Sequence, residues 1–145
     1  MLSFTSTALM AQQIDPLSAY NGDTSKYVAA NFIAGKNKYI NQPLALLLKE
    51  LGIPVKSYAK GLNERNINVV PGLSLYFSDA AAWHMSRFPK SGELCVYISF
   101  VTPVASDAAG ALYKQSDGAW LPAEEKYYGE QLVKDIQLIK PMASK

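Results

Sequence analysis

His84 is the only histidine among the 145 residues, so the search for catalytic chemistry starts there. A single histidine excludes zinc sites built from several histidines. A nucleophilic triad would have to use His84, and Ser78 and Asp79 lie near it in the sequence, although triads are assembled in space. No serine lies in the glycine-flanked pattern of a nucleophile elbow. We therefore expect no metal site, and a small hydrolase or transferase centred on His84 is the alternative function.

Cys95 is the only cysteine, so no disulfide can form within the chain. Its position in the strand-like run ELCVYISFV predicts a buried structural thiol. Glu124 and Glu125 are adjacent and are interpreted as the first residues of a helix, where carboxylates favour the positive end of the helix dipole. The sequence contains no glycine-rich phosphate loop and no calcium loop, so no cofactor is expected.

Aromatic residues are the remaining class with a capacity for recognition, with nine tyrosines and two tryptophans in the chain. Such side chains combine rigid apolar area with a polar tip, which suits interfaces and platforms for stacking sugars. The alternative to a binding role is a structural one, in which the tyrosines pack at the boundary of a small sheet. We predict an aromatic binding surface on solvent-facing strand positions and in loops, formed by Trp83, Tyr97, Tyr113, Trp120, Tyr127 and Tyr128.

Charge and hydropathy argue against a nucleic-acid partner and against a membrane-spanning helix. The net charge is only +2, the lysines are dispersed, and Arg65 and Arg87 are the only arginines, so no nucleic-acid partner is expected. No apolar stretch reaches the roughly 20 residues that a membrane-spanning helix needs. With 49% hydrophobic and 18% charged residues, the chain has enough apolar side chain to fill one core.

Residues 2–11 have the character of the end of a bacterial secretion signal. They are apolar or hydroxylated. Ser6-Thr7-Ala8 has the small-x-small pattern for cleavage before Leu9, and a second candidate cut lies before Gln12, where the −3 residue, Leu9, is less suitable. The basic start of such a signal is missing, because the first basic residue is Lys26. We expect residues 1–11 to be a remnant of a secretion signal and the protein to be periplasmic or secreted; the alternative is the apolar start of a cytoplasmic protein.

A leucine stripe gives the clearest helix signal. Leucines at 44, 47, 48 and 51 share one helical face, Gly52 provides the stop, and Asn41 is the predicted N-cap, with Pro43 in the first turn. A further short helix is expected over 80–88, and another begins at 122. The segment 103–118 is predicted as a loop with a short strand at 111–113.

Strands are predicted over 53–59, 67–79, 93–102 and 132–140, with a bulge, kink or edge position at Pro71-Gly72. Both faces of 93–102 are apolar, so this strand is expected to be central. The pattern predicts a single small α+β domain over 12–145, with a mixed or antiparallel sheet of four to five strands and two or three helices packed on one face. We expect an exported, non-catalytic binding or interaction module whose partner is an envelope protein or a glycan.

Overall fold

The computed structural model describes residues 14–61, 63, 65–77 and 94–139. The predicted helix over 80–88, with Asp79, Trp83 and His84, therefore lies outside the described residues, as do the signal-like residues 1–11. The elements in chain order are a 3-10 turn Leu17–Tyr20, α2 Thr24–Val28, a π-helical turn Ala29–Ile33, a 3-10 turn Lys36–Lys38, α3 Leu44–Leu51, β1 Ser57–Lys60, β2 Val69–Tyr76, β3 Cys95–Ala105, α5 Ser106–Ser116, α6 Pro122–Gly129 and β4 Val133–Ile139.

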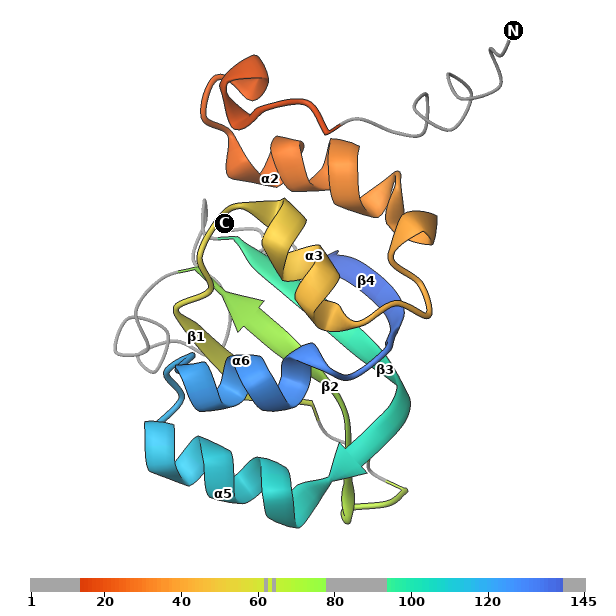
Figure 1. Ribbon diagram of the computed structural model, residues 1–145, viewed down its shortest axis with the longest axis vertical. Coiled ribbons are helices and arrows are strands. Elements are labelled where there is room, and N and C mark those ends of the chain that lie inside the picture. The colour runs from red at the N-terminus through yellow and green to blue at the C-terminus, as the bar shows by residue number, and fades with distance from the viewer. Residues whose placement is uncertain (1–13, 62, 64, 78–93, 140–145) are drawn as a thin grey trace, which may run out of the picture.

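The described strands form one antiparallel sheet in the order β1-β2-β3-β4, and the helices pack against it to give a small α+β domain (Figure 1). Both α3 and α6 lie over the same face of this sheet, with α2 beyond α3 and α5 beyond α6. The predicted fold class is confirmed, and β3 is an interior strand as expected. Strand β1 is shorter than predicted, because residues 53–56 precede the ladder.

The leucine stripe of α3 faces the sheet, but the helix starts differently from the prediction. Leu44, Leu47 and Leu51 are buried, and Gly52 ends the helix with a left-handed φ of 72°. Asn41 is not the N-cap: its φ is 64° and its backbone N–H donates to the carbonyl of Val133. The bridge to β4 therefore fixes the approach of the chain, and α3 begins directly after an extended Pro43.

The amino-terminal helical segment is tied to α3 by polar contacts. Tyr27 Oη donates to the carbonyl oxygen of Leu51 at 2.9 Å. Glu50 Oε1 accepts from Lys38 Nζ at 2.6 Å and from Tyr39 Oη at 2.8 Å. The hydrogen bond from Lys38 lowers the pKa of the Glu50 carboxyl, whereas burial raises the pKa of the Tyr39 hydroxyl. The carboxylate thus stays charged and the phenol stays a donor, which keeps both bonds in place across the neutral pH range.

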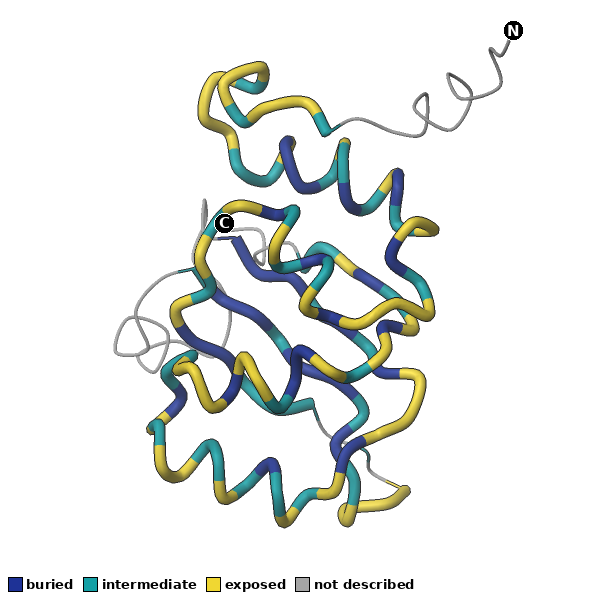
Figure 2. Tube along the Cα trace, viewed as in Figure 1, coloured by how far each residue is buried: buried dark blue, intermediate teal, exposed yellow. Residues whose placement is uncertain are grey.

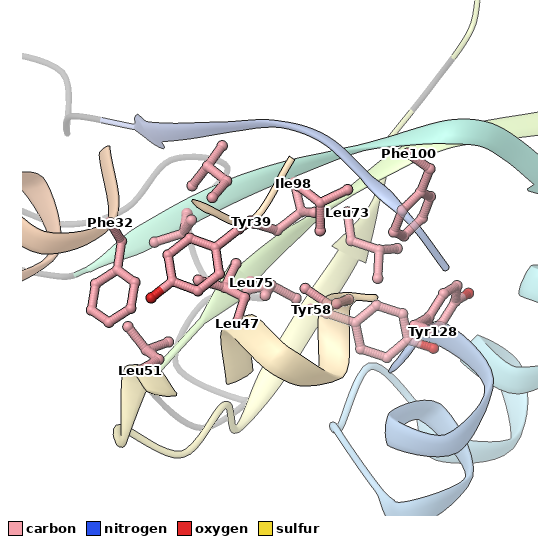
Figure 3. Close-up of a cluster of buried hydrophobic side chains, with 14 of the residues drawn as sticks. Phe32, Tyr39, Leu47, Leu51, Tyr58, Leu73, Leu75, Ile98, Phe100 and Tyr128 are labelled. Carbon is pink, nitrogen blue, oxygen red and sulfur yellow. The ribbon is translucent and has the colours of Figure 1, made fainter. Parts of the chain in front are cut away.

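The core fills the space between α3, α6 and the sheet. Figure 3 shows Phe32 and Tyr39 at one end of the core and Tyr58 and Tyr128 at the other. Buried positions gather on the inner strands, whereas α5 and the chain turns are largely exposed (Figure 2). The largest side chains below 2% exposure are those of Tyr39, Tyr58, Tyr128, Phe32, Leu44, Leu73, Leu75, Ile98, Ile136, Glu124, Val28 and Val133.

The segment 103–118 contradicts the loop prediction. Strand β3 continues to Ala105, and α5 follows directly as a helix without the predicted strand at 111–113. Ser106 fixes the start, because its backbone N–H donates to the carbonyl of Asn68 at 2.8 Å and its Oγ donates to that of Ile67 at 2.7 Å. The alanines that follow favour helix, and Ala109 is fully buried, so packing outweighs the cost of Gly110 within the helix.

The predicted irregularity at Pro71-Gly72 is a shift of register in the β2–β3 ladder. Tyr97 lies on the sheet face opposite the core, since it neighbours the inward-facing Ile98 along β3. Its phenol covers two glycines: a Cβ added at Gly72 would lie 2.8 Å from Tyr97 Oη, and one added at Gly61 would lie 2.6 Å from the same atom. Tyr97 therefore packs directly on the backbone of Gly61 and Gly72.

Replacing Gly72 with alanine is expected to lower the free energy of unfolding by about 1–3 kcal/mol, the usual cost of overpacking. The added methyl group would meet both the Tyr97 ring and the carbonyl oxygen of Ile98, which is backbone and cannot swing away. Gly110→Ala is the matched control, because its Cβ would meet only Lys60 Nζ at 3.9 Å. This control should be stabilising by about 0.5–1 kcal/mol through helix propensity. Equal urea midpoints for the two variants would contradict the packing described here.

Candidate binding site

Trp120 lies in the connection between α5 and α6, and backbone hydrogen bonds hold this connection against the edge of the sheet. The N–H of Trp120 donates to the carbonyl of Lys56 at 2.9 Å, and the N–H of Tyr58 donates to that of Gly118 at 3.0 Å. Ala119 forms an isolated antiparallel bridge with Ser57. The tryptophan is therefore presented from backbone that is fixed on both sides.

A hollow of about 220 Å³ lies beside Trp120. Its lining residues come from the segment before β1 and from the start of α6, namely Pro54, Val55, Trp120, Leu121, Pro122 and Glu125. Leu121 is 44% exposed, which is high for a large apolar side chain. Glu125 is exposed and has no ion pair among the described residues. The hollow thus combines an indole ring, aliphatic walls and one free carboxylate.

Three aromatic rings surround Tyr58 behind this hollow. Its ring centroid lies 5.4 Å from those of Tyr113 and Trp120 in edge-to-face geometry, and 5.8 Å from that of Tyr128. Trp120 also stacks on Tyr128 at 5.9 Å with an interplanar angle of 23°. Such pairs add to the free energy of burying each ring. The indole is consequently braced from within the core while part of it stays at the surface.

Glu124 is a buried carboxylate, 1% exposed, at the base of the aromatic cluster. Its Oε2 accepts from Tyr58 Oη at 2.9 Å, and its Oε1 accepts from the backbone N–H of Leu121 at 3.3 Å. The second bond satisfies a free donor at the start of α6, so the predicted helix start at Glu124 and Glu125 is confirmed. Burial, together with the hydrogen bond to Glu124, raises the pKa of the Tyr58 hydroxyl, which therefore remains a donor.

Two buried polar atoms of the aromatic cluster around Tyr58 have no hydrogen-bond partner among the described residues. These atoms are Trp120 Nε1 and Tyr128 Oη. Unpaired buried donors are uncommon and each costs free energy relative to its hydrated state. The polar groups of the cluster are therefore only partly satisfied by the described residues.

The structure separates the aromatic residues that the sequence suggested as one surface. Trp120 lines the hollow, and Tyr113 and Tyr127 are half-buried near it through contacts with Tyr58 and Tyr128. Tyr97 lies on the opposite face of the sheet, away from this cluster. Tyr128 is 0% exposed, so its expected place on an exposed surface is wrong: its ring is needed between Phe100 and Trp120 in the core. Trp83 lies outside the described residues.

Sequence reasoning missed most of the apolar wall of the hollow. Pro54, Val55 and Leu121 carry no reactive group, and they come together only because the α5–α6 connection joins the edge of β1. It also missed Glu124 as a buried partner of Tyr58, because carboxylates at helix starts are usually solvated. The proline at position 122 was a usable signal, since it marks the helix start that closes the hollow.

The described residues contain no group of three or more histidine, cysteine, aspartate or glutamate side chains arranged to hold a metal ion. Within the same ranges, no helix has the length and apolar character required to cross a membrane. Comparison of the chain with protein-family models, curated protein sequences and solved structures gave no match. The functional assignment accordingly rests on the geometry of the chain's own residues.

Replacing Tyr58 with phenylalanine is expected to lower the free energy of unfolding by about 1–3 kcal/mol, because the buried Glu124 carboxylate loses a hydrogen-bond donor. Chemical denaturation of the purified variant measures this loss. Tyr113→Phe is the control, since its half-buried ring contacts the same cluster and its hydroxyl makes no hydrogen bond among the described residues. A loss no greater than that of the control would show that the bond is not a structural constraint.

Proposed function

We propose that the protein is a non-catalytic binding module and that its ligand contacts Trp120 in the hollow between the segment preceding β1 and the start of α6. The observation that carries this proposal is a partly exposed indole, braced by Tyr58 and Tyr128, beside a concave surface with aliphatic walls. Rigid aromatic side chains of this kind dominate binding energy at recognition sites. The backbone bonds of the α5–α6 connection support it, because they reduce the ordering cost on binding.

A glycan is the ligand class that the hollow favours. Its volume of about 220 Å³ lies below the usual range for drug-sized ligands, so it has room for one small ring rather than an extended peptide. Sugar rings present apolar C–H groups on one face and hydroxyl donors at the edge. Trp120 offers the apolar partner, and the exposed carboxylate of Glu125 offers an acceptor for hydroxyl groups.

Fluorescence of Trp120 tests this assignment directly. The chain has two tryptophans, so Trp83→Phe leaves Trp120 as the single reporter. Titration of this variant with a panel of neutral and acidic trisaccharides should shift the emission for at least one sugar, with a dissociation constant in the range of about 0.1–10 mM. An emission spectrum unchanged by every sugar up to about 50 mM would contradict a glycan site at Trp120.

Variants of the rim separate binding from folding. Leu121→Ala and Glu125→Gln alter exposed side chains. Each should raise the dissociation constant of the sugar that shifts the Trp120 emission by about three- to tenfold, with little change in thermal stability. Trp120→Ala is unsuitable as a first test, because removing the indole also removes ring contacts with Tyr58 and Tyr128 and destabilises the core. Lys126→Gln, on an exposed position of α6 outside the lining, should leave affinity unchanged.

We propose further that the module acts outside the cytoplasm, as a periplasmic or secreted protein. The support is the signal-like character of residues 2–11, which are apolar or hydroxylated and contain the small-x-small pattern Ser6-Thr7-Ala8. Intact mass of the native protein after cell fractionation tests this part. A mature start near Leu9 or Gln12 in the periplasmic or external fraction is expected. An intact Met1 in the cytoplasm would overturn the compartment while leaving the glycan test unaffected.

A further inference from the structure

A second, larger hollow lies between the β1–β2 connection and the start of α5. Its volume is about 360 Å³, within the range of small-molecule sites. Its lining includes Lys60, Asn63, Ile67, Val69, Val70 and Ser106. None of these residues lines the Trp120 hollow, so the two sites can be tested separately.

Most of the wall of this second hollow is aliphatic. Val70 is 4% exposed and belongs to the core, whereas Ile67 is 81% exposed. At that exposure nearly the whole Ile67 side chain is available to contact the apolar part of a ligand, and covering it would remove apolar surface from water. Ser106 holds the chain here by donating its Oγ hydrogen to the carbonyl of Ile67 at 2.7 Å, so Ile67 is fixed at the rim.

Lys60 is the charged side chain among the described lining residues, and it forms no ion pair with another described residue. Lys60 Nζ lies 5.1 Å from the ring centroid of Tyr113, a cation–π contact that orients the ammonium group. Among the described residues, ion pairs form at Lys36 with Asp135 and at Lys38 with Glu50, and none involves Lys60. The described lining contains no acidic residue.

Asn63 adds a second donor to this lining. Its Oδ1 accepts from the backbone N–H groups of Arg65 at 3.0 Å and of Asn66 at 3.2 Å. These two bonds occupy the side-chain oxygen and leave the Nδ2 hydrogens, which make no hydrogen bond among the described residues. Among the described lining residues, Lys60 Nζ and Asn63 Nδ2 are therefore side-chain donors without a hydrogen-bond partner, and they favour a ligand with acceptor oxygens and negative charge.

From this combination we infer that the second hollow binds a small amphipathic carboxylate, with its carboxylate at Lys60 and its alkyl or aryl body against Ile67, Val69 and Val70. The ammonium supplies a charge-assisted hydrogen bond, and the aliphatic wall supplies burial for the ligand's body. This inference does not rest on the glycan site, since no residue of the Trp120 hollow takes part in it.

Titration with sodium octanoate, followed by amide chemical shifts of the full chain, tests the inference. Octan-1-ol and octylammonium are the probes of equal chain length with neutral and positive heads. Octanoate should shift the amides of Gly61, Val69 and Ser106 and bind at least fivefold more tightly than octan-1-ol, with octylammonium weakest. Equal affinity for octanoate and octan-1-ol, or shifts confined to other parts of the chain, would overturn it.

Two variants assign the contacts. Lys60→Met keeps the length of the side chain but removes the charge. It should lower the affinity for octanoate at least fivefold and leave the affinity for octan-1-ol unchanged. Ile67→Ser changes a side chain that is 81% exposed, so it should leave folding intact and weaken both ligands. Lys114→Met, at an exposed position of α5, is the control for loss of a lysine charge. Octanoate affinity that is unchanged in Lys60→Met would exclude the proposed carboxylate contact.

Discussion

The side chain of Tyr58 is the constraint on which the carboxyl-terminal half of the fold depends. Its ring contacts Tyr113 on α5, Trp120 in the following connection and Tyr128 on α6. Its hydroxyl donates to the buried Glu124 carboxylate. One residue of a four-residue edge strand thus positions two helices and the loop between them. A buried carboxylate is tolerated at this point only because a phenol and a backbone N–H satisfy its oxygens.

The amino-terminal half is organised differently, because polar contacts tie it to the last turn of α3 and to β4. Tyr27, Lys38 and Tyr39 each form hydrogen bonds with the last turn of α3, to the carbonyl of Leu51 or to the carboxylate of Glu50. A further ion pair joins Lys36 to Asp135 on β4 at 2.7 Å, and it lowers the pKa of that carboxyl. Ion pairs that are this exposed contribute little free energy, so they orient the helical segment more than they stabilise it.

The periodicity of apolar residues predicted the helices and strands that bury one face against the core. The leucines of α3 and the alternating residues of β2 and β3 carry their own signal, because burial on one face imposes a repeat of 3.6 or 2. Helix α5 was missed because its glycine at 110 and its weakly amphipathic, alanine-rich sequence leave no clear stripe. Asn41 had suitable chemistry for a cap, yet its bridge to β4 is a long-range contact that no local pattern reveals. The same limit applies to the candidate site, where residue type suggested Trp120 but gave no indication that Pro54 and Val55 would lie beside it.

The connection that carries Trp120 also protects the sheet from association. An edge strand presents unpaired backbone groups to which strands of other molecules can add. On β1 this edge is taken by the chain itself, through the bonds from Tyr58 to Gly118 and from Trp120 to Lys56. Detachment of this connection would expose the backbone edge of β1. It would also remove the Trp120 ring from its contacts with Tyr58 and Tyr128 in the core. The proposed binding at Trp120 and the protection of the β1 edge therefore depend on the same five-residue turn, so a variant that loosens this turn would weaken that protection.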